Sequence, residues 1–487
     1  MLNLELKRSD KQPLYQQIAE HIKTQISDGR LPANTRLPTV RNLAATLGVT
    51  RLTVQNAYSE LQSLGWVEAT VGRGTFVSTA VQRISLHPAI GQYLTPDSAI
   101  NDMLELDQVV GVRSMALAIP DSTLFPTDIF WDNLSHLRSQ ANELMGYGPI
   151  QGDTALRIAL MKLIEEKGIT AVPEDIFITS GTLQGLSLVT QTIADAGDNA
   201  LVDAPTFLGM LNILKAQKIN PITVPFTADG PDLDAFEHAI NTHKPRFYYA
   251  VPTFHNPTGH TISAEKRAAI LHLAQKHNIM IVEDDIYSDL AYDGPPPPTF
   301  TAQDTNDRVI YISGFSKSVM PGMRVGYIVM PPQLRTRLQT LRRATDLCGT
   351  VFVQRALAHF IQNGSFKQHL KRVIPIYRDR RDALLATLRT TMPPVVNWSR
   401  PGGGYSSWIS LPRYFAPGEL YRRALQHGFA FTPGEAYQID DERHEFLRLC
   451  FGNQRVQAIR AGVMLLSQLI KEQIATGSPS SNWIPIV

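Results

Sequence analysis

The stretch VIYISGFSKSVMPGMRVGYIV occupies residues 309–329. Two short apolar runs, residues 309–312 and 325–329, enclose a polar turn that contains Lys317 and Arg324. Branched and aromatic residues dominate both runs, which predicts two buried strands. Since open α/β sheets bind ligands just beyond the carboxyl ends of their strands, the position of Lys317 predicts the centre of a binding site.

The chain around this stretch alternates short apolar runs with amphipathic stretches of helical periodicity. This alternation predicts an α/β fold with a mainly parallel sheet covered by helices. A polar motif follows each run, at the edge where such sheets bind ligands. The predicted strands lie at residues 176–179, 200–202, 247–250, 279–282, 309–312 and 325–329.

The polar motifs carry the groups that pyridoxal phosphate requires. This cofactor needs a lysine that bonds it, an acid that keeps its ring nitrogen protonated, donors for its phosphate and a face on which its ring stacks. Lys317 is the candidate catalytic lysine, and Asp284, at the end of a predicted strand, is the candidate acid. Tyr287 and Asn256 can hold the phenolic oxygen, and Phe207 offers the stacking face.

Donors for the phosphate are found in two further motifs. Residues 179–184 lead into a predicted helix, whose first backbone N–H groups form an anion site at Gly181, Thr182 and Leu183. Arg324 adds a guanidinium for the same phosphate. Each of these residues alone has an ordinary structural explanation, such as a solvated charge or a turn. Their joint occurrence, in one order and at strand ends, favours a cofactor site.

A separate small module is predicted in residues 13–77. After a first helix, Thr39 can cap a helix that runs to about Leu47, and Thr50 can cap another that runs through Leu64. Two short helices joined by a turn that contains glycine form a helix-turn-helix. The apolar face of the first helix consists of Leu14, Ile18, Ile22 and Ile26, which recur every four residues.

The third helix of this module is the predicted DNA-recognition helix. Only the N-terminal residues of such a helix reach base edges in the major groove. Arg51, Thr53 and Gln55 occupy those positions, and Arg41 of the preceding helix can reach a guanine edge or a phosphate. Any one of these residues could be an ordinary solvated side chain, but the group in this frame favours DNA binding.

A hairpin wing is predicted after the recognition helix. Residues 66–69 and 75–77 read as strands around Gly72-Arg73-Gly74, so that Arg73 approaches the sugar-phosphate backbone. Residues 1–79 carry three more basic than acidic residues, whereas the whole chain has a net charge of +2. The excess of positive charge is therefore concentrated in the first sixth of the chain, which favours a module that faces phosphates.

The small module resembles the GntR-type winged helix, over about 65 residues in the same order. The resemblance implies that Arg41, Thr50, Arg51, Thr53, Gln55 and Gly72 contact DNA. One position departs from the pattern, since Leu52 stands where many relatives carry a polar residue, and it is expected to shift base preference. The matching runs are residues 14–18, 36–44, 47–54, 57–58 and 72–77.

The larger module resembles the fold-type I aminotransferases over about 350 residues. Three further segments carry this resemblance, residues 147–152, 400–408 and 448–451. It implies that Lys317 bonds the cofactor, that Arg448 receives the carboxylate of an amino acid-like ligand, and that Tyr147 reaches the phosphate in a neighbouring subunit.

One position of the larger module departs from the family pattern. Three residues before the lysine the family usually has Ser or Thr as a phosphate ligand, whereas this chain has Gly314. Ser313 and Ser316 are the candidates to replace that ligand.

The two modules together resemble the MocR family, a GntR-type head followed by a linker and an aminotransferase-like body. The expected domains are residues 1–78 for the head, 79–112 for the linker and 113–475 for the body. The fold class is then a winged helix-turn-helix joined to an α/β fold-type I large domain and a smaller α+β domain. The family implies a homodimer, domain-swapped head to tail, with two heads on paired half-sites of double-stranded DNA.

Two functions are compatible with this organisation. In the first, the chain is a transcription regulator, and its body senses a small amino compound or pyridoxal phosphate itself. In the second, the body is a working aminotransferase with an accessory head, and Lys317 moves the Cα proton. The regulator is favoured because it accounts for a DNA-binding head, whereas transamination alone does not. A third possibility, a head kept only for assembly, is disfavoured by the intact Arg41 and Arg51.

Composition excludes several classes of protein. No run of about 18 apolar residues is present, which argues against a membrane span. The first ten residues are charged and lack the apolar core of a signal peptide. The two cysteines, Cys348 and Cys450, are far apart and have no metal-type spacing. We therefore expect a cytoplasmic protein with buried thiols and no metal site.

Overall fold

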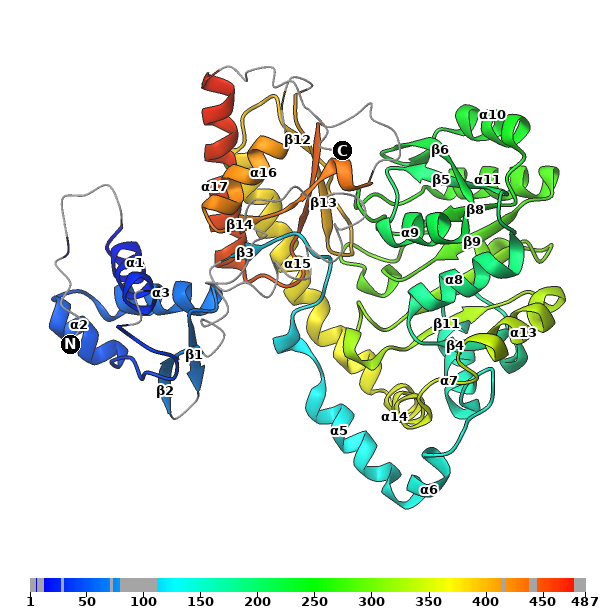
Figure 1. The fold of residues 1–487 in the computed structure, drawn as a ribbon, viewed down its shortest axis with the longest axis horizontal. Helices are drawn as coiled ribbons and strands as arrows, with labels where there is room; N and C mark the ends of the chain where they lie inside the picture. The colour runs from blue at the N-terminus through cyan, green and yellow to red at the C-terminus, as the bar shows by residue number, and fades with distance from the viewer. Residues whose placement is uncertain are drawn as a thin grey trace.

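The computed structural model describes residues 6, 13–27, 30–70, 73–78, 112–412, 415, 417–437 and 445–476. An N-terminal head, residues 13–78, precedes a larger body, residues 112–476, and lies beside it near β3 and β14 (Figure 1). The predicted linker, residues 79–112, lies outside the described residues except for Val112.

The head is a winged helix with its own apolar core. Its helices are α1 (Leu14–Ser27), α2 (Val40–Leu47) and α3 (Arg51–Ser63). Both predicted caps are confirmed, since the Thr39 hydroxyl accepts from the Asn42 amide and the Thr50 hydroxyl from the Thr53 amide. The wing strands β1 (Val67–Thr70) and β2 (Gly74–Val77) pair antiparallel. The core includes Ile18, Ile22, Ile26, Leu43, Val54, Leu61 and Val77.

The body contains an eight-stranded sheet in the order β4-β11-β10-β9-β8-β5-β6-β7, which defines its large domain. The central strands β10, β9, β8, β5 and β6 are parallel to one another. Strand β11 is antiparallel to both of its neighbours, and β7 is antiparallel to β6. The strands are β4 (Ile176–Thr179), β5 (Asn199–Ala204), β6 (Asn220–Thr227), β7 (Gly230–Pro231), β8 (Phe247–Ala250), β9 (Met280–Asp284), β10 (Val309–Gly314) and β11 (Gly326–Val329).

Each of the six strands predicted in this sheet is present, so the predicted mainly parallel sheet is confirmed. The prediction missed β6, which lies near one edge of the sheet and in which only Val224 is fully buried. A search for continuous apolar runs detects central strands, which are buried on both faces, more readily than strands near an edge.

Helices cover the sheet and connect its strands. Helix α8 packs against β4, β10 and β11, and α10 packs against β5 and β6 (Figure 1). The large-domain helices are α5 (Thr127–His136), α6 (Ala141–Leu144), α7 (Thr154–Glu165), α8 (Thr182–Ile193), α9 (Leu208–Gln217), α10 (Leu233–His243), α11 (Ala264–His277), α12 (Phe300–Gln303), α13 (Arg335–Thr345) and α14 (Val351–Gln362).

A second sheet, in the order β12-β13-β16-β15, defines the small domain, to which the pair β3–β14 also belongs. The long helix α15 (Ser365–Thr391) runs into this domain and packs against α17 (Val456–Thr476), which also contacts α16 (Pro417–Gln426). The strands are β3 (Arg113–Ser114), β12 (Asn397–Trp398), β13 (Ser406–Ser410), β14 (Phe429–Ala430), β15 (Thr432–Pro433) and β16 (Phe446–Cys450).

Candidate cofactor site and DNA-binding face

Asp284 is the last residue of β9, and only one of its two carboxylate oxygens accepts a hydrogen bond from a side chain. Tyr249, from the neighbouring strand β8, donates its hydroxyl to Asp284 Oδ2 at 2.9 Å. Asp284 Oδ1 is buried and receives no hydrogen bond of acceptable geometry, although the Ile286 amide lies near enough to lower the pKa of this carboxyl. Burial outweighs both hydrogen bonds and raises that pKa to about 7. A protonated ring nitrogen is the kind of donor that a buried, unengaged carboxylate oxygen requires.

Lys317 lies beyond the carboxyl end of β10. Its Nζ donates to the carbonyl oxygen of Ala118 at 2.7 Å. Burial, and to a smaller extent the positive charge of Arg448, lower the pKa of Lys317 to about 8. A large fraction of Lys317 is therefore the neutral amine at pH values where a surface lysine is charged, which suits a nucleophile.

The predicted phosphate motif packs closely against Arg324 and against β11. Gly181, with φ of 90°, immediately precedes α8. A Cβ atom at Gly181 would lie 2.6 Å from Nη2 of Arg324, and one at Gly326 would lie 2.8 Å from the backbone nitrogen of Thr182. Arg324 Nη2 also donates to the carbonyl oxygen of Ser180 at 2.9 Å. The structure thus brings the predicted helix N-terminus and Arg324 together, at a distance that only glycine permits.

Gly314 is explained by the packing of its strand. It pairs with Gly326 across β10 and β11, and a Cβ atom there would lie 3.1 Å from the Gly326 Cα. Ser313 is buried, and its hydroxyl donates to the carbonyl oxygen of Asp285 at 2.9 Å, so it does not replace the missing ligand. Ser316 is the remaining serine candidate.

Phe207 precedes α9 and rests against a glycine. A Cβ atom at Gly209 would lie 2.5 Å from Cε1 of the Phe207 ring and 2.7 Å from a methyl group of Leu183. Leu183, at the start of α8, is 43% exposed. Phe207 and Leu183, which come from separate predicted motifs, therefore lie side by side.

Arg448, on β16, is 4% exposed and is already engaged by groups of the chain. Its Nη1 donates to Asn256 Oδ1 at 2.7 Å, and its Nη2 donates to the carbonyl oxygen of Ala116 and, at 3.2 Å, to Thr432 Oγ1. The Tyr437 ring lies 5.0 Å from the guanidinium carbon. Two predicted site residues, Arg448 and Asn256, are thus in direct contact.

Two predicted tyrosines occupy opposite environments. Tyr287 is 2% exposed, and its ring meets the ring of Tyr405 edge to face at 6.3 Å. Tyr147, in the connection between α6 and α7, is 91% exposed and therefore packs against almost nothing within the chain. Its predicted role concerns a neighbouring subunit, which a single chain does not contain.

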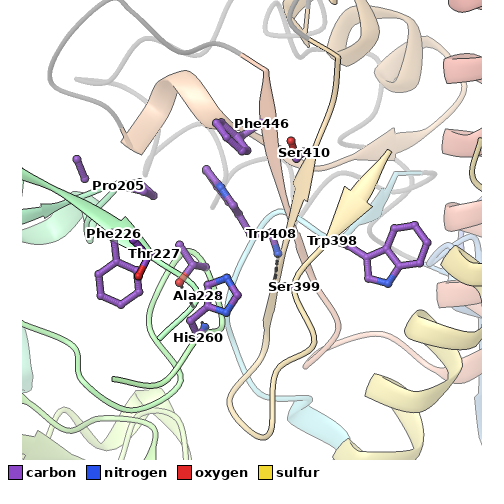
Figure 2. Close-up of a pocket in the computed structure, with 12 residues that line it drawn as sticks. Pro205, Phe226, Thr227, Ala228, His260, Trp398, Ser399, Trp408, Ser410 and Phe446 are labelled. Atoms are coloured by element: carbon purple, nitrogen blue, oxygen red, sulfur yellow. Dashed lines mark hydrogen bonds between the residues drawn. The ribbon is translucent and has the colours of Figure 1, made fainter. Parts of the chain in front are cut away.

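A cleft of about 280 Å³ separates the large and small domains next to this site (Figure 2). Pro205 and Phe226 line it from the large domain, and Trp408 and Phe446 line it from the small domain. Trp408 is the direct cross-strand partner of Arg448 in the β13–β16 pair. The aromatic wall of the cleft thus begins beside the predicted carboxylate anchor.

The DNA-binding candidates of the head are exposed. Arg41, Arg51, Gln55 and Arg73 project into solvent from α2, from the first turns of α3 and from the wing. The hydroxyls of Thr50 and Thr53 hydrogen-bond to each other at 2.8 Å, so capping already engages both. Leu52 is also exposed, at 65%, whereas Gly72 lies outside the described residues.

Several residues of the site were not predicted from the sequence. The carbonyl groups of Ala116 and Ala118 come from a segment that carries no motif, and Thr432 and Tyr437 come from the small domain. Tyr249 could have been predicted from the sequence. A tyrosine in a strand whose residues are all buried must find a hydrogen-bond partner for its hydroxyl.

Comparisons with known proteins identify two different families in the two parts of the chain. Residues 14–77 match the model for bacterial regulatory proteins of the gntR family, and residues 99–461 match the model for aminotransferase class I and II. The "Uncharacterized HTH-type transcriptional regulator YdfD" of Bacillus subtilis is 29% identical over 96% of this chain and 98% of its own length. The "Probable rhizopine catabolism regulatory protein MocR" of Rhizobium meliloti is 28% identical over 88% of both chains.

The body alone is similar to solved enzymes. The kynurenine aminotransferase of Pyrococcus horikoshii, solved in complex with PMP, superposes with a TM-score of 0.74 at 32% identity. The match covers 81% of this chain and 98% of that one. No helix among the described residues is both long and apolar enough to cross a membrane.

Proposed function

Since the chain belongs to the MocR family, in which a GntR-type winged helix precedes a class I and II aminotransferase domain that binds pyridoxal phosphate, we propose that it is a ligand-responsive transcription regulator. The signal is a small amino compound or pyridoxal phosphate itself. The observation that carries the proposal is the presence, in one chain, of exposed candidate DNA-contacting side chains in the head and an assembled set of candidate cofactor residues in the body. A site that only bound a ligand would need no such head.

The residues of the site fit pyridoxal phosphate, since Asp284 Oδ1 is buried without a hydrogen bond in the described structure and the Arg324 guanidinium lies at the start of α8, beside Gly181. When bound, this cofactor supplies an aldehyde for covalent attachment and a ring that withdraws electrons. Lys317 holds it, and Asp284 keeps its ring nitrogen protonated. The other predicted cofactor contacts are Tyr287, Asn256, Phe207, Gly181, Thr182, Leu183, Ser316 and Arg324.

Arg448 orients the ligand by binding its carboxylate. To do so it must exchange hydrogen bonds with Asn256 and Ala116 for bonds to the ligand. Such an exchange changes the contact between the two domains, because Arg448 belongs to the small domain and Asn256 to the large one. Ligand binding is therefore coupled to the relative position of the domains.

The regulator acts as a homodimer on double-stranded DNA in the cytoplasm, with its heads exchanged between subunits. Support for the dimer comes from apolar side chains exposed on one part of the large domain, around α5 and α6. Trp131 is 67% exposed, Met145 70% and Tyr147 91%. Exposed apolar residues grouped in this way are typical of an interface between chains.

A second candidate function is transamination by the body. Its support is the assembled site together with the 32% identity to an aminotransferase over most of the body. The lowered pKa of Lys317 also suits a general base that moves a proton near neutral pH. Weak transaminase activity is compatible with the regulator, whereas a head that binds no DNA is not.

The test is selection of bound DNA by the purified full-length protein from genomic fragments, with and without pyridoxal phosphate. We expect enrichment of a discrete sequence with repeated half-sites, in an amount that depends on pyridoxal phosphate or on an added amino acid. Arg51→Ala is the matched control, because it removes a base-reading candidate from the head and leaves the body unchanged. No enrichment by a protein that binds the cofactor and transaminates would establish the enzyme instead.

A further inference from the structure

The turn that follows β9 carries two of the predicted cofactor contacts. Strand β9 ends at Asp284, and Tyr287 lies three residues further on, just before the short helix η6 (Ser288–Leu290). Both side chains are buried, so neither has room to adjust by moving into solvent. The position of this turn therefore decides where the carboxylate and the phenol lie.

A single ammonium group from another part of the chain holds the turn at both ends. Lys167 Nζ donates to Asp285 Oδ2 at 3.2 Å and to Ser288 Oγ at 2.8 Å. It also pairs with Asp289 Oδ1 at 2.9 Å. Asp285 directly follows the predicted acid, and Ser288 directly follows the predicted tyrosine. The three hydrogens of the ammonium are therefore matched by three acceptors, all within residues 285–289.

Lys167 is itself fixed by its place in the large domain. It lies two residues after α7, and its amide donates to the carbonyl oxygen of Ile164 at 2.9 Å. Ile164 and Ile169, on either side of it, are buried in the core. The Lys167 side chain is only 18% exposed. The ammonium therefore reaches the turn from a well-packed support.

The charge of Lys167 has a second effect on the site. Glu283, Asp284 and Asp285 are three consecutive carboxyl groups, and all of them are buried. Burial, and to a smaller extent the charge of Asp285, raise the pKa of Asp284 to about 7. Burial alone would lower the pKa of Lys167, but the charges of Asp289 and Asp285 outweigh burial and hold this pKa above its ordinary value. The ammonium therefore stays charged and offsets the negative charge that acts on Asp284.

We propose that Lys167 is a positioning residue of the cofactor site, which holds the Asp284 carboxylate and the Tyr287 phenol in place through the turn that carries both. Lys167 lies in none of the motifs that predicted the site, and it contacts the turn at residues other than the two that it positions. The inference concerns the bound cofactor and requires neither DNA binding nor regulation. Its failure would leave the proposed function standing, and the reverse also holds.

The readout is the pH at which the visible absorbance of the bound cofactor changes in the full-length protein. This midpoint reports the proton affinity of the nitrogen that joins Lys317 to the cofactor. A carboxylate that keeps the ring nitrogen protonated and a phenol that donates to the phenolic oxygen both lower this affinity, because both withdraw electrons from the ring. When the turn is displaced, the midpoint should therefore move to higher pH. The groups that set the charge around Lys317 are the same in every variant, namely Arg448, Cys450, Asp284 and Arg324.

Two variants weaken the hold on the turn to different degrees. Lys167→Met removes the ammonium and keeps a long side chain, and it should raise the midpoint by about one pH unit, which is a tenfold change in proton affinity. Asp289→Asn keeps the size of a side chain that is 15% exposed and weakens only one of the three contacts. It should fold normally and raise the midpoint by a smaller amount.

Arg335→Gln is the matched control. Arg335 pairs with Asp175, and their side chains are 26% and 14% exposed, close to the values for Lys167 and Asp289. Asp175 directly precedes β4, so this pair lies at the opposite end of the strands from the site. The melting temperature of the loaded protein should fall in both Lys167→Met and Arg335→Gln, because each change leaves a partly buried carboxylate without its cation. The midpoint should stay unchanged in Arg335→Gln.

The outcomes separate a positioning role from a structural one. A lower melting temperature with an unchanged midpoint in Lys167→Met would overturn the inference, because Lys167 would then stabilise the domain without acting on the site. A midpoint that moves equally in Arg335→Gln would also overturn it, because the shift would then reflect a general loss of stability. If Lys167→Met does not fold, Asp289→Asn decides alone. A shift to higher pH supports the inference, and no shift or a shift to lower pH overturns it.

Discussion

Arg51 in the head and Arg448 in the body are both predicted to bind an anionic partner, yet their surroundings differ. Arg51 is exposed on the first turn of α3. Arg448 is 4% exposed and donates to Asn256 and Ala116, which come from distant parts of the chain. Changes in the head should therefore have local effects, whereas changes in the body should spread to neighbouring groups.

The largest effect is expected for Lys317→Ala. The variant should lose the visible absorbance of lysine-bound pyridoxal phosphate completely. Among the described residues, Lys317 is the lysine that directly follows β10, where the cofactor is expected. Absorbance spectra after addition of the cofactor measure this. Lys367→Ala, on the exposed surface of α15, is the control and should bind normally. An unchanged band in Lys317→Ala would exclude this lysine from the site.

The next effect concerns pH. A lysine attacks an aldehyde only as the neutral amine, and burial lowers the pKa of Lys317 from 10.5 to about 8. The rate at which the apoprotein attaches the cofactor should therefore rise with pH up to about 8 and then level off. Stopped-flow absorbance over a range of pH values measures the position of this plateau.

Arg448→Gln sharpens the pH test. The charge of Arg448 lowers the pKa of Lys317 more than that of Arg324 does, so its removal should move the plateau to higher pH. Arg324→Gln, which is also expected to weaken phosphate binding, should move the plateau less. Equal plateaus in all three proteins would mean that the two sites are not coupled electrostatically.

In the head, Arg51→Ala should weaken binding to the selected DNA site by roughly 1–3 kcal/mol if Arg51 reads a base. Binding to random DNA should change much less. Titrations of both DNAs, followed by fluorescence anisotropy at one salt concentration, measure the difference. An equal loss on both DNAs would make Arg51 a phosphate contact.

The two threonine caps offer a matched pair. Thr39→Ala and Thr50→Ala should each destabilise the head by about 1 kcal/mol, because each hydroxyl accepts from one backbone amide at the start of a helix. Thermal unfolding of the head measures this. If Thr50 also contacts DNA, as the GntR resemblance implies, only Thr50→Ala should weaken binding beyond the loss of stability.

The smallest effect is expected for Leu52→Gln. Because Leu52 is 65% exposed, its replacement should change the free energy of unfolding by less than about 0.5 kcal/mol. The selected DNA sequence should nevertheless change at one position, since an apolar side chain can contact a thymine methyl group. An identical selected sequence would place Leu52 away from the bases.

The sequence by itself determined the features that depend on nearby residues. The caps at Thr39 and Thr50, the central strands and the position of Lys317 beyond β10 follow from periodicity and from residue types a few positions apart. The order of the motifs also determined that a GntR-type head precedes an aminotransferase-type body.

Only the tertiary structure decided which groups meet across the fold. Lys317 and Ala118 are 199 residues apart, and Arg448 and Asn256 are 192 apart. The orientation of Ser313 toward the Asp285 carbonyl was decided in the same way. Such contacts depend on how strands and domains align, and no local pattern encodes that alignment, because many residue pairs could satisfy the same buried donor or acceptor.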